Sequence, residues 1–472
     1  MRELATHERE LITKMHGLIV TKRRRNQLRT KYFEGKKRLD SFGISVPPQL
    51  RDFETVIGWP AKACTTKSRR IKPEGFTLSH PSELLDEIRE EFAAARMQWL
   101  ERQAIDAAVQ HSVAFVFQSR GREGEPDVVT VVKDAEQATA ILDPRTGQTI
   151  AALEMVSNTR WLLHTPGMVT MCASQLGKWV AVEDYPTVPG KVFCVPYIHG
   201  ATLKRQFGQS RITRPVMGFT DMAVRTLLRQ EVSAEFYSAP QRYMLGATDD
   251  MFTDEDGNPV PAWEAMIGAL LVAPDPDPDE NPDAKRVDVG EFRQMSMEPH
   301  SAHMRTIAMM FSGETSIPPG YLGIIQDNPE SAEAKWASEE DLVSSAEAEF
   351  PAIDMARTQL AKDRVALLHG EWTDTMAADL KTLTTHFRSP STPTQQTLSQ
   401  AVATEVGAGI LPPTGRVTWE RMGYSQSMID QLEKNQREDD VRKLTEAVRE
   451  GAVKRQADER VVELAGRRGN TD

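Results

Sequence analysis

The chain has 472 residues, a formal net charge of −11 and 40% hydrophobic residues. A chain of this size can bury a large core, and its length predicts two to four domains or subdomains. The acidic balance argues against a general nucleic-acid binder, because affinity for phosphates depends on dense Lys and Arg contacts. It does not exclude a protein that lets nucleic acid pass without binding it.

No run approaches the roughly 18 consecutive apolar residues that a membrane span needs, so we expect no membrane partner. The stretch MRELATHERELITKMHG lacks the apolar segment of a signal peptide, which predicts a location in the cytoplasm of the cell that makes the chain. The three cysteines, Cys64, Cys172 and Cys194, are scattered and show no CxxC spacing. We expect them to be reduced and buried.

Helices are predicted for residues 1 to about 25 and for 82–110, where apolar residues recur with a period of about 3.6. Between these helices, residues 21–39 are strongly basic. This segment is either a solvated helix face or a surface for an acidic partner or nucleic acid.

From Ser112 to Pro196 the pattern changes to short runs rich in β-formers, separated by turn residues. This alternation predicts an antiparallel sheet. The predicted strands are VAFVFQ, DVVTVV, QTIAALEMV, RWLLH, MVTMCA, KWVAVEDY and KVFCVPY.

A helix is predicted from Pro215 to Ser238, since proline is well suited to the first helical position. Residues 273–292 are acidic and proline-rich, which favours an exposed, extended loop. A short amphipathic helix follows, with apolar residues at i, i+3, i+4 and i+7: Met304, Ile307, Ala308 and Phe311.

The stretch IPPGYLGIIQDNPESAEA, residues 317–334, is neither a good helix nor a good strand, and it is unusually apolar for a loop. Asn328 is a plausible N-cap for a long helix, which Pro351 should kink or split. Its apolar seam is interrupted at Arg357 and Arg364. Short helices joined by turns follow, and the highly charged chain past Asn435 is expected to be a mobile tail.

Enzyme signatures are weak. CASQLGKWV lacks the first glycine and the Ser or Thr of a phosphate-binding loop, and no GxSxG or HExxH motif occurs. His300 and His303 could share a helix face, but no third metal ligand is near. The sequence predicts no catalytic residues, metal or cofactor. The alternative is a metal-dependent nuclease, for which the clustered carboxylates are Asp249, Asp250, Asp254 and Asp256.

Several segments resemble the portal proteins of tailed bacteriophages, particularly of phages that infect actinobacteria. They occur in that family's order, from about residue 30 to residue 430. The segments are YFEGKKRL, SVPPQLRDF, RITRPVMGFTDMAVRTLLRQEVSAEFYSAPQRYMLGA, GETSIPPGYLGI, DNPESAEA and GAGILPPTGRVTWERMGYS.

The resemblance implies an α+β portal-type fold with an α/β wing, a two-helix stem, a small α/β clip and a helical crown, assembled as a ring. It implies these boundaries: wing 1–213, first stem helix 214–238, clip 239–298, second stem helix 299–314, tunnel loop 315–328, long wing helix 329–369, crown 370–435 and charged C-terminal tail 436–472.

The resemblance also implies functional residues for three regions. The tunnel loop would face the DNA channel through Ile317, Tyr321, Leu322, Ile324, Ile325 and Gln326; alternatively, Tyr321, Leu322 and Ile325 pack the loop onto its own wing. The clip would dock the motor and then an adaptor through Asp275, Asp277, Asp279, Glu280, Asp283 and Glu291. The stem would pack through Val224, Leu227, Leu228, Met304, Ile307 and Phe311.

The implied protein is a homo-dodecamer at one capsid vertex of the virion, assembled in the host cytoplasm. Its implied partners are the major capsid protein, the scaffold, the terminase large subunit and a head–tail adaptor. Double-stranded DNA would pass through it without specific binding during packaging and ejection.

Overall fold

The computed structural model describes residues 2–39, 55–175, 178–237, 242–245, 288–291, 296–324, 332–391 and 395–468. The chain forms two compact units. The first comprises Met1–Arg29, Cys64–Arg211 and Glu330–Asp472, and the second comprises Thr30–Ala63 and Ile212–Pro329. Helices and antiparallel sheets occur together, so the predicted α+β class is confirmed.

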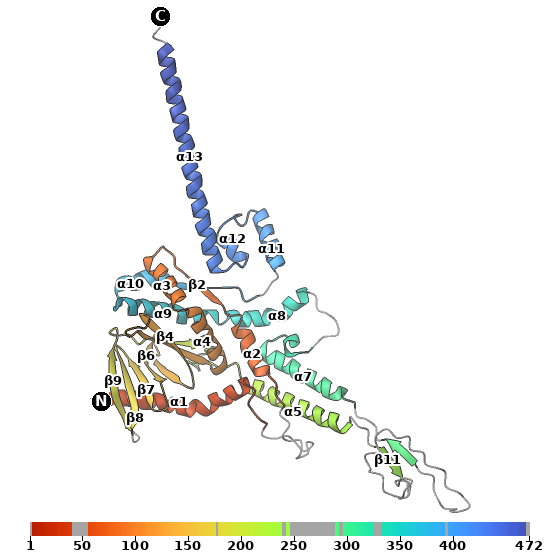
Figure 1. Cartoon of the computed structure of the whole chain (residues 1–472). Coiled ribbons are helices and arrows are strands. Elements are labelled where there is room, and N and C mark those ends of the chain that lie inside the picture. Colours follow the sequence, from red (N-terminus) through yellow and green to blue (C-terminus); the bar gives the residue numbers. More distant parts are fainter. Residues whose placement is uncertain are drawn as a thin grey trace, which may run out of the picture. The chain divides into compact units, whose positions relative to one another are not determined.

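The larger sheet of the first unit has six antiparallel strands in the order β1-β9-β8-β7-β6-β5. Helix α1 (Thr6–Phe33) packs on it, and Figure 1 shows the helix running along the sheet. Ile12, Met15 and Ile19 recur at helical spacing and are buried against the sheet. The strands are β1 (Arg2–Glu3), β5 (Ala138–Leu142), β6 (Thr149–Met155), β7 (Arg160–Thr165), β8 (Met168–Gln175) and β9 (Lys178–Pro186).

A second sheet has the order β10-β3-β4, formed by Cys194–Ile198, Val113–Arg120 and Val128–Asp134. Side chains of β3 and β10 share a buried core with those of β5 and β6, so the two sheets pack together. Every predicted strand is present. Strand β5 was missed in the sequence because ATAIL carries only two strong β-formers beyond its alanines.

Helices surround the second sheet. α4 (Met97–His111) and α9 (Phe350–His369) pack on it, and β2 (Pro73–Thr77) pairs with β13 (Thr384–Phe387). The remaining elements of this unit are α3 (Glu83–Ala94), α8 (Ala332–Glu347), α10 (Asp374–Asp379), η4 (Leu380–Thr382), α11 (Gln395–Gly407), α12 (Arg416–Arg421) and α13 (Gln426–Arg468); α2 (Trp59–Ser68) contributes its last residues.

Two predictions concern the helices of the C-terminal half. The long helix is split into α8 and α9 at Pro351, as predicted. Beyond Asn435 the charged tail, which was predicted to be mobile, is helical as far as Arg468, the last residue of α13. Its sequence contains few helix breakers, and short-range ion pairs such as Arg442 with Asp439 lie along it.

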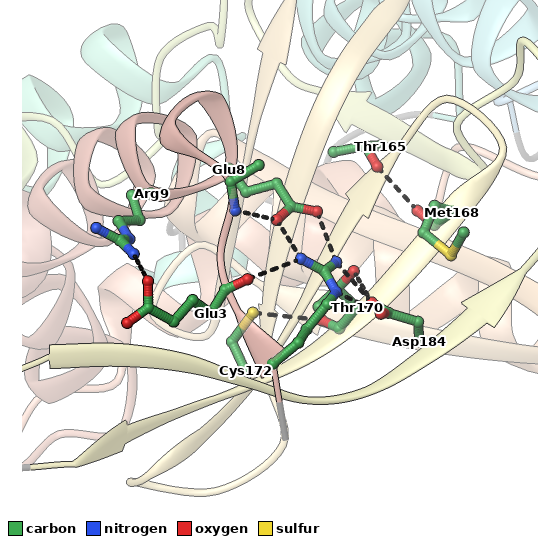
Figure 2. Close-up of polar contacts among 10 residues, drawn as sticks. Glu3, Glu8, Arg9, Thr165, Met168, Thr170, Cys172 and Asp184 are labelled. Atoms are coloured by element: carbon green, nitrogen blue, oxygen red, sulfur yellow. Dashed lines mark hydrogen bonds and ion pairs between the residues drawn. The ribbon is translucent and has the colours of Figure 1, made fainter.

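The start of the chain is held to the six-stranded sheet by a polar cluster. The Arg2 guanidinium donates to both carboxylate oxygens of Glu8, at 2.7 and 2.8 Å, and to both oxygens of Asp184. Figure 2 shows Glu8, Thr170 and Asp184 gathered at this point. The Arg2 hydrogen bonds lower the pKa of both carboxyl groups, so both stay ionised opposite the cation.

A second cluster joins the 199–209 loop to the start of α9. His199 Nδ1 lies 2.6 Å from the carbonyl oxygen of Gln209, and its Nε2 lies 3.4 Å from Glu349 Oε1. Lys67 Nζ donates to the same Glu349 oxygen at 2.7 Å. Burial lowers the pKa of His199 to about 4, with Glu349 opposing this shift, so the imidazole is neutral at pH 7.

We therefore expect the free energy of unfolding to decrease as the pH drops from about 6.5 to about 4. In this window the unfolded chain binds a proton at position 199 that the folded chain does not. The slope from one such group is at most about 1.4 kcal/mol per pH unit. Urea unfolding at pH 7, 6 and 5 measures it, and an equal slope in a His199→Gln variant would contradict the assignment.

Glu101 and Arg357 form a third, fully buried pair. Their exposed fractions are 2% and 4%, and Arg357 Nε donates to Glu101 Oε1 at 2.8 Å. Arg357 also donates to the carbonyl of Gly75 and lies over the ring of Phe76, 4.2 Å from its centroid. Tyr197 donates to the same carboxylate oxygen. This pair therefore ties α4 to α9 and to β2.

All three cysteines are free and buried, as predicted. Burial raises the pKa of Cys64 and of Cys172 to about 12, and it also raises the pKa of Cys194. The thiols are therefore protonated near neutral pH. They lie in α2, β8 and β10, respectively.

Candidate functional site: a helix pair and the turn that follows it

The second unit is built on two packed helices, α5 (Arg214–Tyr237) and α7 (Glu298–Thr315). Both were predicted from the sequence, α5 from Pro215 at its start and α7 from its apolar periodicity. Val216, Ala223 and Leu228 of α5 are buried, as are Ile307 and Phe311 of α7.

Of the six predicted stem-packing residues, Leu228, Ile307 and Phe311 are at most 1% exposed. The other three, Val224, Leu227 and Met304, are half-buried. Apolar side chains that a single chain leaves half-buried can be covered further by another chain.

Polar groups inside the pair are satisfied locally. The hydroxyl groups of Thr220, Thr226 and Thr315 each donate to the carbonyl four residues earlier, at 2.7–2.9 Å. At one end of the pair, the Thr213 hydroxyl donates to Glu314 at 3.0 Å. The helices can therefore bury these hydroxyls without hydrogen-bond partners from another element.

Two aromatic residues from earlier in the chain complete this unit. The Tyr32 hydroxyl lies 2.9 Å from both carboxylate oxygens of Asp221, and Trp59 packs on Phe311 with ring centroids 5.3 Å apart. Sequence reasoning assigned neither contact, because the partners lie 189 and 252 residues apart. The one available signal was that Tyr32 opens the YFEGKKRL segment.

Replacing Tyr32 with Phe should lower the free energy of unfolding by about 1.5–3 kcal/mol, the range for a hydrogen bond to a charged group. Tyr32 is only 5% exposed, so water cannot easily replace the lost donor. Urea denaturation measures the change. Tyr185→Phe, at a half-exposed tyrosine, is the control and should change stability by less than about 0.5 kcal/mol; an equal loss in both variants would contradict a special role for Tyr32.

The structure describes the apolar turn after α7 as far as Ile324. Ser316 adopts a left-handed conformation at φ 51°, the Ser312 hydroxyl donates to the Ile317 carbonyl at 2.6 Å, and a short helix, η3, spans Pro319–Leu322. Ile317 is 1% exposed, so it anchors the turn inside this unit and does not face solvent in the single chain. For this residue the structure corrects the expectation of a channel-facing side chain.

The other predicted channel residues have different positions. Tyr321, Leu322 and Ile324 are half-buried, and Lys62 Nζ lies 5.5 Å from the centroid of the Tyr321 ring. Ile325 and Gln326 lie outside the described residues, as does the predicted N-cap Asn328. The turn therefore presents partly exposed apolar side chains with one cation beside them.

Of the predicted clip, the structure describes a two-stranded ladder, β11 (Arg242–Leu245) and β12 (Asp288–Glu291). Tyr243 pairs with Gly290, and a Cβ at position 290 would collide with the Tyr243 ring. Glu291 is exposed at the end of the ladder, opposite Arg242. The remaining predicted docking residues lie outside the described part: Asp275, Asp277, Asp279, Glu280 and Asp283.

Within the described residues, no group of three or more His, Cys, Asp or Glu side chains could hold a metal ion. His300 Nε2 instead lies 3.4 Å from the Ser233 hydroxyl across the helix pair. The carboxylates of the nuclease alternative, residues 249–256, lie outside the described ranges. No helix in the described ranges is long and apolar enough to cross a membrane.

Two curated relatives align with most of the chain. The portal protein of Mycobacterium phage D29 is 25% identical over 398 residues, which cover 81% of this chain and 79% of that protein. The portal protein of Mycobacterium phage L5 is 24% identical over 413 residues, covering 84% and 82%. No family model matches the sequence.

Solved structures that align with most of the chain come from gene transfer agent particles. A chain of the virion of the native particle covers 84% of this chain at 11% identity, with a TM-score of 0.40. A chain of the neck of the native particle, computed with C12 symmetry, covers 77% at 12% identity and a TM-score of 0.40.

The chain is thus an α+β protein whose second unit is built on a helix pair followed by an apolar turn. Both sequence relatives are portal proteins of phages that infect actinobacteria. The resemblance predicted from the sequence is confirmed. The nuclease alternative finds no support, since neither relative is named as a nuclease.

Proposed function

We propose that this chain is a phage portal protein, which forms a ring at one vertex of the capsid and conducts DNA during packaging and ejection. The observation that carries the proposal is the alignment with two portal proteins over about four-fifths of each chain. The protein acts as a structural conduit without catalytic residues of its own. The ring contains twelve copies.

The portal regions follow the boundaries expected from the sequence. Helices α5 and α7 form the stem, the β11–β12 ladder belongs to the clip, and the mixed sheets with α1, α8 and α9 form the wing. Residues 370–435 form the crown, and the charged tail beyond is the end of α13. The direct packing of α5 on α7, with the clip strands between them in sequence, supports this division.

The tunnel loop, residues 315–328, reaches into the channel. Tyr321, Leu322 and Ile324 are its described contact residues, and their partial exposure supports this role. DNA phosphates can move past apolar and uncharged side chains without being bound, whereas closely spaced cations would bind the phosphates. Ile317 acts as the fixed end of the loop, because it is buried within the unit.

The clip docks the terminase large subunit during packaging and then a head–tail adaptor, while the wing contacts the major capsid protein and the scaffold. The acidic, proline-rich segment 273–292 supports an exposed docking surface. Deletion of residues 275–284 should abolish binding of the motor or the adaptor without changing the number of subunits in the ring. Unchanged binding would remove this assignment.

The ring itself is tested by native mass spectrometry with negative-stain images of the purified protein. Twelve chains of 52.8 kDa have a mass of about 634 kDa, and the images should show a central hole. If the protein stays small, it should be co-expressed with the scaffold and capsid protein of its phage. A monomer or dimer under both conditions would overturn the proposed function.

A further inference from the structure

A cationic cavity lies in the first unit, between α1, the junction of α4 with β3, and the turn before β5. Its volume is about 40 Å³, room for roughly three water molecules at about 10–15 Å³ each. Its apolar wall includes Ile19, Phe115 and Phe207. Its polar lining consists of Lys22, Arg25, Asn26, His111, Ser112 and Thr139.

The cations around this cavity have no acidic partners. Among the described carboxylates, none forms an ion pair with Lys22, Arg25, the adjacent Arg29 or Arg205. Arg29 Nη1 donates to the carbonyl of His111 at 3.0 Å, yet its buried Nε has no acceptor. Burial, and then repulsion by Arg25 and Arg205, lowers the pKa of Arg29 to about 10. This local concentration of positive charge is unusual in a chain of net charge −11.

A second unsatisfied group lies in the wall. His111 is 4% exposed, and its Nδ1 has no hydrogen-bond partner. Its Nε2 is 4.0 Å from Glu136 Oε1, and Asp134 is also near the ring. These two carboxylates lie on the His111 side of the cavity, while the α1 side is cationic.

We propose that this cavity binds a phosphate group. A phosphate needs several donors and a compensating positive charge, which Lys22 and Arg25 in the lining supply, with the charge of Arg29 nearby. The Ser112 and Thr139 hydroxyls can donate as well, and His111 can either donate to a phosphate oxygen or accept from a protonated one. The bound anion would also relieve the repulsion among Arg25, Arg29 and Arg205.

The phosphate could come from free inorganic phosphate or from a nucleic-acid backbone, and two probes distinguish these sources. The full-length protein is titrated with sodium phosphate by isothermal calorimetry at constant ionic strength, and with a short DNA duplex by fluorescence anisotropy. We expect saturable binding near one phosphate per chain. Arg25→Gln should weaken binding by about tenfold or more, the effect of losing one charge-assisted hydrogen bond.

Arg24→Gln is the matched control, because Arg24 is an exposed arginine of the same helix, as Arg25 is, but does not line the cavity. If Arg25→Gln selectively weakens only duplex binding, the source is the nucleic-acid backbone; if it selectively weakens only phosphate binding, the source is the free ion. Equal effects of Arg24→Gln and Arg25→Gln with both probes, or no saturable binding of either, would overturn the proposal.

Discussion

Replacement of Phe311 with Ala should lower the free energy of unfolding by about 3–5 kcal/mol, because truncating a buried aromatic removes its transfer free energy and leaves a cavity. Phe311 is fully buried between the two helices of the second unit and packs on Trp59. Urea denaturation followed by circular dichroism measures the loss. The proposed ring should become unstable at the same time, since its stem depends on this helix pair.

Met309→Ala on the same helix is the matched control. Met309 is 64% exposed in the single chain, so its truncation should change the stability of the isolated chain by less than about 0.5 kcal/mol. Equal losses in the two variants would show that the helix pair does not pack through the Phe311 face.

Replacement of Arg357 with Ala should cost about 3–5 kcal/mol, the usual effect of leaving one member of a buried ion pair without its partner. The Glu101 carboxylate would keep the hydrogen bond from the Tyr197 hydroxyl but lose its cation, inside a core where it is only 2% exposed. The stacking of Arg357 over Phe76 would also be lost. Urea denaturation at pH 7 measures this change.

The double variant Glu101→Leu with Arg357→Met separates the two causes of this loss. If the uncompensated charge dominates, the double variant should recover much of the stability that Arg357→Ala loses. Arg437, whose side chain is 83% exposed beside Glu433, is the control, and Arg437→Ala should change stability by less than about 0.5 kcal/mol. A similar loss at both arginines would contradict the importance of burial.

The sequence predicted the elements well where periodicity is a local signal. The antiparallel strands from Val113 onward, helices α5 and α7 and the break at Pro351 follow from apolar spacing and proline chemistry alone. Such signals depend on neighbours within a few residues. Local signals of this kind can therefore be recognised without knowledge of the tertiary fold.

Buried charges show what this reasoning misses. Arg357 and Arg364 looked like interruptions of an apolar seam, yet both are buried and paired, with Glu101 and Glu91. Their partners lie 256 and 273 residues away in sequence, so no local pattern could indicate the pairing. The same holds for the Tyr32–Asp221 contact at the candidate site and for the cationic cavity beside α1.

The three buried thiols can report on local unfolding of the protein. A protonated, enclosed thiol reacts with maleimides only when its surroundings unfold locally, so labelling rates at Cys64, Cys172 and Cys194 would report separately on α2, β8 and β10. Because the chain has no other cysteine, each label can be located by peptide mass. Comparing these rates before and after assembly would show which of these elements becomes harder to open, without introducing any probe residue.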